Sequence, residues 1–188
     1  MADPRRPAVS VVIVARDDGA AARRLLAALG VQTLGVARVE AIVVDDGSSP
    51  PLSAAPSLVR TRLVRVPGVG AGAAANAGLR HARAPVVVFL TPSAVPAPDL
   101  LARHVAMLED PGVGVVLGAL SPLAGGAPHR APLTAHGSAR TELLHALAGL
   151  DEDLHDEDAV SAELVARARA RGAAVAAPDD LAVAYSQK

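Results

Sequence analysis

The residues of this sequence that could carry chemistry are acids and small polar residues at the ends of apolar runs. In the segment "VEAIVVDDGSSP", an apolar run is followed by Asp45 and Asp46. In "VVVFLTPSAVPAP", another apolar run is followed by Thr91, Pro92 and Ser93. Loops that follow buried strands are where α/β enzymes usually hold metal-binding carboxylates, but the second loop has none. The first motif is also an ordinary turn signal, because Asp, Gly and Ser dominate turns. Its role therefore depends on the elements around it.

Two further sets of titratable residues stand in the second half of the chain. Residues 151–158, "DEDLHDED", hold six of the 19 acids and precede a helical pattern. This segment either caps the helix, since acids favour the first turn, or contributes to a site. The histidines His129, His136, His145 and His155 lack the close helical spacing that is typical of a zinc site. We interpret them as surface or loop residues.

Composition narrows the class of protein. The chain has 188 residues, which suits one domain, and its net charge of −1 gives no global field that would attract nucleic acid. Aromatic residues make up 1% of the chain, too few for the stacking platforms of single-strand binders. The sequence has no cysteine, which excludes disulfides and thiolate nucleophiles. We expect no nucleic-acid partner.

The apolar runs are all short. The N-terminal residues lead directly into a first strand, whose apolar run over 9–15 is followed at once by Arg16, so we do not interpret them as a signal peptide. No run approaches the ~18 apolar residues that a membrane helix needs. We therefore expect a cytoplasmic protein without a membrane span.

Alternating strands and helices position the candidate residues. β-branched apolar runs predict strands, and amphipathic or small-residue runs between them predict helices. The expected strands are 9–14, 39–44, 62–66, 86–90, 113–119, 173–177 and 181–185. The expected helices are 20–29, 71–82, 98–109, 138–147 and 159–171, with a loop over 121–135. This rhythm predicts an α/β fold, a doubly wound, mostly parallel sheet flanked by helices, whose ligands lie beyond the carboxyl ends of the strands.

The order of these segments resembles that of the family-2 glycosyltransferases, which have the GT-A nucleotide-diphospho-sugar transferase fold. Five segments match family motifs in order and spacing over nearly the whole chain: "VSVVIVARDDGAAARRLLAAL", "VEAIVVDDGSSP", "GAGAAANAGLRHARAPVVVFL", "PAPDLLARHVAMLED" and "GSARTELLHALAGLDEDL". The resemblance implies a single GT-A-like domain over residues 1–188. Its nucleotide-binding half would be 9–119 and its acceptor-side half 120–188.

The resemblance also implies transfer of a sugar, with inversion, from a nucleotide-sugar donor to a sugar, lipid or small-molecule acceptor. Asp45 or Asp46 would accept a hydrogen bond from a ring N–H of the base, and the glycines would let the backbone approach the nucleotide. The residues expected at the donor are Ala15, Arg16, Asp17, Asp45, Asp46, Gly47, Gly70, Asn76, Thr91 and Ser93. A protein partner is a further expectation.

The sequence departs from the family where a divalent cation should bind. Family members carry Asp-x-Asp after the fourth strand, which holds Mn²⁺ or Mg²⁺ against the donor diphosphate. Residues 91–93 are Thr-Pro-Ser and have no charge. The family's Arg in Ala-Arg-Asn is Ala75, and the acid after its Gly-Ser-x is Pro50. We therefore expect no metal ligands here, and hypothesise that His129 or Arg130 supplies positive charge instead.

The family's catalytic base, which takes the proton from the acceptor hydroxyl, stands in an acidic pair at the start of a late helix. Glu157 and Asp158 fit this pair by residue type. An alternative alignment, anchored on Glu163 and Arg167, places the pair at Val160 and Ser161 and would mean that the base is lost.

Two rival interpretations remain. The segment 68–73, "GVGAGA", imitates a dinucleotide-binding fingerprint, but it follows the third strand and no acid ends the next one. An oxidoreductase is therefore disfavoured, and no Gly-x-Ser-x-Gly elbow indicates a hydrolase. The stronger rival is a noncatalytic glycosyltransferase-fold module that binds a nucleotide or a partner.

Overall fold

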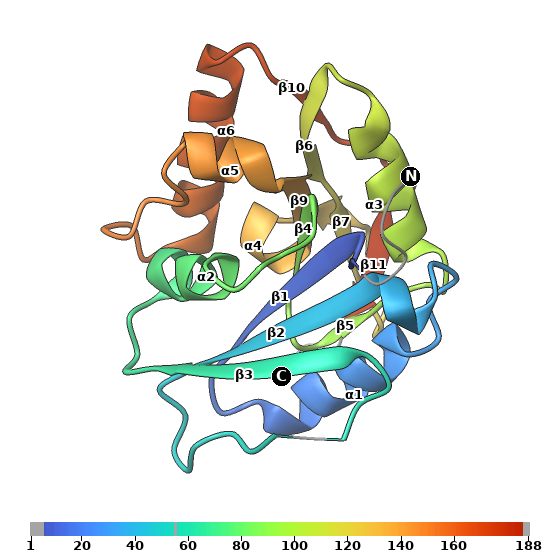
Figure 1. The fold of residues 1–188 in the computed structure, drawn as a ribbon, viewed down its shortest axis with the longest axis vertical. Helices are drawn as coiled ribbons and strands as arrows, with labels where there is room; N and C mark the ends of the chain where they lie inside the picture. Colours follow the sequence, from blue (N-terminus) through green and yellow to red (C-terminus); the bar gives the residue numbers. More distant parts are fainter. Residues whose placement is uncertain (1–5, 55, 186–188) are drawn as a thin grey trace.

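The computed structural model describes residues 6–54 and 56–185 and arranges their strands in two sheets (Figure 1). The strands of the large sheet are β1 (Val9–Ala15), β2 (Val39–Asp46), β3 (Arg60–Val66), β4 (Val86–Leu90), β6 (Val113–Leu117), β9 (Gly137–Arg140) and β10 (Ala174–Ala176). Their spatial order is β10-β6-β9-β4-β1-β2-β3. All neighbouring pairs are parallel except those made by β9. The predicted mostly parallel sheet is therefore confirmed.

Helices cover both faces of this sheet. The helices are α1 (Gly19–Leu29), the 3₁₀ helix η1 (Val36–Arg38), α2 (Ala71–Leu79), α3 (Leu100–Glu109), α4 (Leu133–His136), α5 (Thr141–Ala146) and α6 (Glu157–Ala170). Apolar side chains of α1 and α3 pack on one face, and those of α2, α5 and α6 pack on the other (Figure 1). The central strands are continuous apolar runs in the sequence because both of their faces are buried.

Alternation along β1 shows how one strand serves two cores. Val9, Val11 and Ile13 belong to the core under α1 and α3, while Val12 belongs to the core under α2 and α6. Successive side chains of a strand point to opposite faces, so a single β-branched run fills both layers. This arrangement leaves the loops at the strand ends as the place where polar residues gather.

A second, smaller sheet lies beside the carboxyl end of β4. Its strands are β5 (Ala94–Val95), β7 (Ala119–Pro122), β8 (His129–Arg130) and β11 (Ala182–Tyr185), in the order β5-β11-β7-β8. The sequence predicted one strand over 113–119 and a loop over 121–135. The strand is instead interrupted at Gly118, and the loop region contributes to β7, β8 and α4. A Cβ atom on Gly118 would lie 2.2 Å from the His136 ring, which explains the small residue at the interruption.

Strand β9 overturns the predicted helix over 138–147. Residues Gly137–Arg140 form an antiparallel strand between β4 and β6, and the helix, α5, begins only at Thr141. Its first three residues, Gly-Ser-Ala, are small and buried, and at Gly137 the surroundings leave no room for a side chain. A Cβ atom on Gly137 would lie 2.6 Å from Leu133 Cδ1. Without β-branched or large apolar residues, β9 lacks the usual sequence signal of a strand.

Two histidines are buried rather than exposed, contrary in one case to the sequence interpretation. His136, predicted to lie in a loop or at the surface, is completely buried, as is His104 of α3. His104 Nε2 lies 3.1 Å from His136 Nε2, and its Nδ1 lies 2.8 Å from Ser138 Oγ. His136 Nδ1 donates to the carbonyl of Ala119, so its Nε2 must accept from His104. The chain of hydrogen bonds joins α3, α4 and β9.

No helix among residues 6–54 and 56–185 is long and apolar enough to cross a membrane. Residues 1–5, which the sequence analysis took as the lead into the first strand, lie outside the described residues.

Candidate functional site

The carboxyl ends of β1, β2 and β3 are tied together by side chains of the predicted site. The register places Ala15 beside Asp45 and Asp46 beside Val66. The backbone N–H of Asp17 donates to Ser48 Oγ at 2.9 Å, and Asp17 Oδ1 accepts from the backbone of Ser49 at 2.7 Å. The loop after β1 is thus fixed to the turn after β2, as expected for loops at one edge of a parallel sheet.

Both carboxylates of the Asp-Asp-Gly-Ser turn accept backbone hydrogen bonds. Asp45 is buried, and its two oxygens accept from the N–H groups of Ser48 and Leu52 at 2.9 and 3.0 Å. Burial alone would raise the pKa of Asp45, but these hydrogen bonds and the nearby charge of Arg65 lower it below the ordinary value. The carboxylate therefore stabilises the turn. A contact with a nucleotide base stays a prediction.

Asp46 connects the same turn to the loop after β3. Its oxygens accept from the N–H groups of Val69 and Gly70 at 2.7 and 3.3 Å. The turn fits closely against that loop, because a Cβ atom on Gly47 would lie 2.9 Å from the backbone N of Gly68. Gly47 also has a φ of 80°. Glycine is required here for both its backbone conformation and its lack of a side chain.

The acid-rich segment packs against this same edge. A Cβ atom on Gly70 would lie 2.8 Å from His155 Nδ1, and one on Gly72 would lie 2.2 Å from the carbonyl oxygen of Asp151. Asp46 binds Gly70, and His155 lies over it, so Asp46 and the acid-rich segment meet at one loop. The sequence had placed Gly70 along a nucleotide. In the structure Gly70 makes room for His155, and its contact with a nucleotide stays a prediction.

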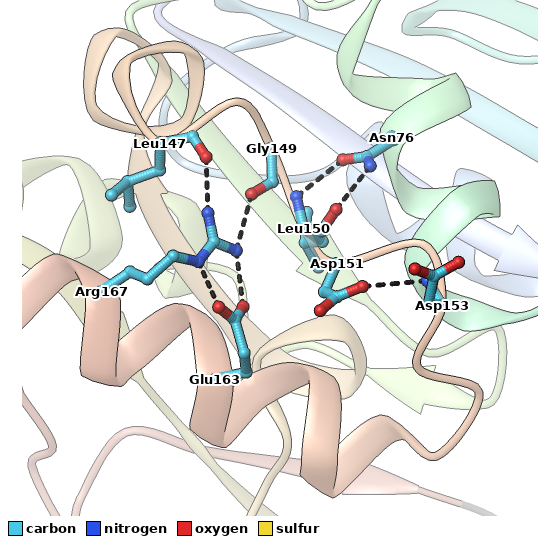
Figure 2. Close-up of polar contacts among 8 residues, drawn as sticks. All are labelled: Asn76, Leu147, Gly149, Leu150, Asp151, Asp153, Glu163 and Arg167. Carbon is cyan, nitrogen blue, oxygen red and sulfur yellow. Dashed lines mark hydrogen bonds and ion pairs between the residues drawn. The ribbon is translucent and has the colours of Figure 1, made fainter.

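Asn76 fixes the start of the acidic segment, as Figure 2 shows. Its Nδ2 donates to the carbonyl of Leu150 at 2.8 Å and to Glu152 Oε1 at 2.9 Å, while its Oδ1 accepts from the N–H of Leu150. These bonds use the amide fully, so Asn76 ties α2 to residues 150–152. Contact between Asn76 and a nucleotide stays a prediction. Gly149 lets the two segments meet, since a Cβ atom there would lie 2.5 Å from Asn76 Oδ1.

Helix α6 is fixed to the same turn from the other side. Arg167 forms an ion pair with Glu163 one helical turn earlier and donates to the carbonyls of Leu147 and Gly149 (Figure 2). Asp156 caps the helix by accepting from Ala159 N at 2.9 Å. Asp156 thus caps the beginning of α6, while Arg167 ties the later part of the helix to residues 147–149.

An open cavity of about 480 Å³ lies where β1, β4 and α6 meet the small sheet. Its lining residues are Val14, Arg16, Asp18, Thr91, Pro92, Ser93, Leu120, Pro132, Ala135, Glu157 and Tyr185. The cavity brings together four residues that the sequence proposed, Arg16, Thr91, Ser93 and Glu157. Asp45, Asp46 and Asn76 do not line it. Asp18 and Tyr185 also line the cavity and were not among the predicted site residues, although Asp18 follows the predicted Asp17 and Tyr185 ends a predicted strand.

Of the two predicted bases, Glu157 lines this cavity and Asp158 does not. Burial raises the pKa of the Glu157 carboxyl, and the charges of Asp158 and Asp156 add to the rise. The side chain keeps access to solvent. The alternative pair is turned inward, because Val160 is completely buried and Ser161 Oγ accepts from Leu133 N at 2.9 Å. Glu157 is thus the one of these four candidate positions that lines the cavity, and a catalytic role for it stays a prediction.

The residues present do not fit a bound divalent cation. The loop 91–93 contributes no carboxylate, and no group of three or more His, Asp or Glu side chains in the described residues could hold a metal ion. Carboxylate oxygens are the ligands that Mg²⁺ and Mn²⁺ prefer. Arg16 is the cationic side chain among the cavity's lining residues. Arg130, hypothesised to supply positive charge, is instead held by Asp179 and three backbone carbonyls.

His129, the other residue in that hypothesis, is exposed and does not line the cavity. Its ring packs edge-on against Tyr185, with 6.0 Å between the ring centroids. Tyr185 does line the cavity, so His129 lies just outside its rim.

Comparison with solved structures defines the class of fold. A mannosyltransferase, PcManGT from Pyrobaculum calidifontis in complex with GDP-Man and Mn²⁺, superposes with a TM-score of 0.72 over 97% of this chain at 23% identity. S. aureus TarS residues 1–349 in complex with UDP-GlcNAc gives a TM-score of 0.76 over 96% of the chain at 17% identity. The fold is therefore GT-A, as the sequence predicted. The chain spans 58% of the length of each of these two proteins.

The family follows from the sequence match. The family model described as Glycosyl transferase family 2 matches residues 10–133, more than half of the chain. The chain belongs to glycosyl transferase family 2. No curated protein sequence matches it.

Proposed function

We propose that this chain is an inverting glycosyltransferase that binds a nucleotide-diphospho-sugar without a divalent cation in the cavity between β1, β4 and α6. The observation that carries the proposal is that Arg16 and Glu157 line one cavity at the carboxyl edge of a GT-A sheet. This edge is where ligands of open α/β sheets bind. Family membership supports the reaction class.

In the proposed reaction, Glu157 accepts the proton of the acceptor hydroxyl. The hydroxyl oxygen then bonds to the anomeric carbon from the face opposite the leaving group, and the bond from that carbon to the diphosphate breaks. The nucleoside diphosphate leaves with the bonding electron pair, and the configuration of the sugar is inverted. A raised pKa suits this role, because a base holds the abstracted proton more firmly as its pKa rises.

Arg16 takes the place of a metal ion in this proposal. The guanidinium would meet the charge that develops on the leaving diphosphate, for which it provides several N–H donors in a planar arrangement. Arg16 extends over Gly68, where its guanidinium nitrogens lie 3.9 Å from the position of a Cβ atom. The hydroxyls of Thr91 and Ser93 line the same cavity and would orient the donor.

The donor is a nucleotide sugar of the kind that the similar structures hold, which are GDP-Man in one and UDP-GlcNAc in another. We propose that residues 9–119 bind its nucleotide and that residues 120–188 face the acceptor. Pro132, Glu157 and Tyr185 line the cavity from that second segment and would contact the acceptor.

A noncatalytic binding module is the second candidate. It is favoured by one observation: Asp45, Asp46 and Asn76, which would contact a nucleotide in an active relative, are all hydrogen-bonded within the protein. In this case the chain keeps the GT-A fold, and these polar residues stabilise the folded structure and do not contact a substrate.

The two candidates differ in donor binding and turnover. We would measure binding of GDP-Man and UDP-GlcNAc calorimetrically in EDTA and in Mn²⁺, followed by release of the nucleoside diphosphate. The proposal expects one donor to bind equally in both buffers and to be consumed. Arg16→Gln should weaken that binding about tenfold or more, since a hydrogen bond to a charged group contributes about 1.5–3 kcal/mol.

Arg24→Gln is the matched control, because it removes the same charge from an exposed position on α1. Its donor affinity should equal that of the unmodified protein. Binding without consumption would support the noncatalytic module. Binding that requires Mn²⁺ would contradict the metal-independent proposal.

A further inference from the structure

A larger cavity, of about 830 Å³, lies at the opposite edge of the large sheet. Four arginines line it: Arg6, Arg60, Arg83 and Arg140. They come from four separate stretches of the chain. Nothing in the proposed transfer reaction uses this edge, where the parallel strands begin.

The register of the sheet explains why these arginines meet. Val9 pairs with both Val39 and Val86, which aligns the beginnings of β1, β2 and β4. Arg60 begins β3 and pairs with Glu40. Arg140 ends β9 opposite Val86, because β9 is antiparallel. The starts of the parallel strands and the end of the antiparallel one therefore lie along one edge.

Two of the four guanidinium groups are fixed by the protein. Arg83 donates through Nε and Nη2 to Glu40 Oε2 at 3.1 and 2.7 Å, and Glu40 also accepts from Ser10 Oγ at 2.7 Å. Burial alone would raise the pKa of Glu40, but these hydrogen bonds and the charge of Arg83 lower it. Arg140 donates to the carbonyls of Leu108 and Asp110. Both guanidinium groups are thereby oriented in advance.

The other two guanidinium groups are available to a ligand. Arg6 and Arg60 are exposed, and their guanidinium groups make no hydrogen bond or ion pair with residues 6–54 or 56–185. A neighbouring hollow of about 290 Å³ shares Arg60 and Arg83 and adds Arg62 and His81. The acids that line the two hollows are Glu142 and Glu40. Positive charge is thus concentrated here in a chain whose net charge is −1.

We infer that these adjoining hollows bind a ligand with clustered phosphate groups. Guanidinium groups bind phosphate oxygens in a planar, two-pronged manner, and two of them are held in place while two are unpaired. Clustered phosphates occur on free polyphosphates and at the surface of membranes that contain anionic lipids, where neighbouring headgroups each contribute one or more phosphates. The site is separate from the proposed donor cavity, so it stands whether or not that proposal holds.

The experiment uses tripolyphosphate as the free probe. We would titrate it calorimetrically into the full chain and into two double variants. Arg6→Gln/Arg60→Gln removes the two unpaired cations of the cavity, and Arg23→Gln/Arg24→Gln removes two exposed cations from α1. Both variants change the net charge equally. The first should bind about tenfold more weakly, while the second should bind as tightly as the unmodified chain.

Equal weakening in both variants, or no binding by the unmodified chain, would overturn the inference, because general charge and not this cavity would then explain the result. Arg62→Gln, in the adjoining hollow, gives an independent variant should the double variant fold poorly. Its far-UV circular dichroism should match that of the unmodified chain, and its affinity should fall.

Co-sedimentation with vesicles then identifies the source of the phosphates. Phosphatidylcholine vesicles with and without phosphatidylglycerol would be compared. Binding to the anionic vesicles that tripolyphosphate displaces would support a lipid-headgroup ligand. Binding of tripolyphosphate without vesicle binding would support a free one.

Discussion

At the scale of single residues, carboxylates of the same type have different roles because of their neighbours. Asp45 is surrounded by backbone N–H groups, which stabilise its charge and lower its pKa. Glu157 stands at the first turn of α6 beside Asp156 and Asp158, with no hydrogen bond within the described residues, and its pKa is raised. The carboxylate of Asp45 is used in hydrogen bonds within the protein, whereas that of Glu157 remains available to a ligand.

Replacement of Glu157 tests the proposed proton transfer. Glu157→Gln should reduce the rate of sugar transfer about 10²- to 10⁴-fold, the usual contribution of a general base, and leave donor affinity unchanged. Transfer should also decline as pH falls through the raised pKa, because only the ionised carboxylate accepts a proton. Rates measured with saturating donor across a pH series check both points.

Asp158→Asn separates the two candidate bases. Removal of its charge should lower the pKa of Glu157, so the acid limb of the pH profile should move to lower pH while transfer persists. Loss of transfer in Asp158→Asn and its retention in Glu157→Gln would reverse the assignment.

At the scale of elements, α6 is positioned by the turn of residues 147–150. Side chains of α2 and α6 bind this turn from opposite sides. Asn76 of α2 binds both backbone groups of Leu150, and Arg167 of α6 binds the carbonyls of Leu147 and Gly149 (Figure 2). The order of these residues along the chain does not reveal the contact, because Asn76 and Leu150 are far apart in sequence. This turn determines where the acidic segment, and therefore Glu157, lies.

Truncation of Asn76 tests this connection. Asn76→Ala leaves the buried N–H and C=O of Leu150 without partners, which should lower the free energy of unfolding by about 2–4 kcal/mol. Arg80→Ala is the control, since exposed Arg80 contacts the same Glu152 at 3.8 Å and should cost less than about 1 kcal/mol. Urea unfolding of both variants provides the comparison, and equal losses would contradict a structural role for Asn76.

At the scale of the whole molecule, the two ends of the sheet have opposite characters. Polar turns and the acidic segment lie at the carboxyl edge, near the proposed donor cavity, and arginines cluster at the amino edge. Between them, the buried histidine pair joins α3, α4 and β9 and thereby the two sheets. Stability of the assembled molecule should therefore depend on the charge state of this pair.

Acidification should destabilise the molecule before its carboxylates titrate. Burial lowers the pKa of His104 to about 3, with the charges of His136 and Arg103 adding to the effect, and burial also lowers the pKa of His136. In the unfolded chain a histidine takes up its proton near pH 6.5. The stability that depends on the neutral rings is thus present above about pH 6.5 and lost as pH falls below it.

The expected loss is up to about 1.4 kcal/mol per pH unit for each buried histidine. Urea unfolding between about pH 6.5 and pH 5 measures it above most of the carboxylate range. His104→Gln should reduce the slope, whereas His145→Gln, at an exposed position of α5, should not. An unchanged slope in His104→Gln would contradict the argument.

The sequence by itself determined the parallel frame and its two helical layers, and it predicted the edge of the sheet at which a ligand would bind. These features depend on local patterns: continuous β-branched runs make strands buried on both faces, and polar turns follow them. It also showed that residues 91–93 contain no carboxylate, since that depends on residue type alone.

Only the tertiary structure decided which residues remain free to act. It assigned Asp46 and Asn76 to internal hydrogen bonds, placed Arg16 and Glu157 on one cavity, and inserted the small-residue strand β9 into the sheet. It also brought together the arginines of the amino edge. Each of these outcomes depends on pairing between segments far apart along the chain, and no local pattern encodes which distant groups will meet.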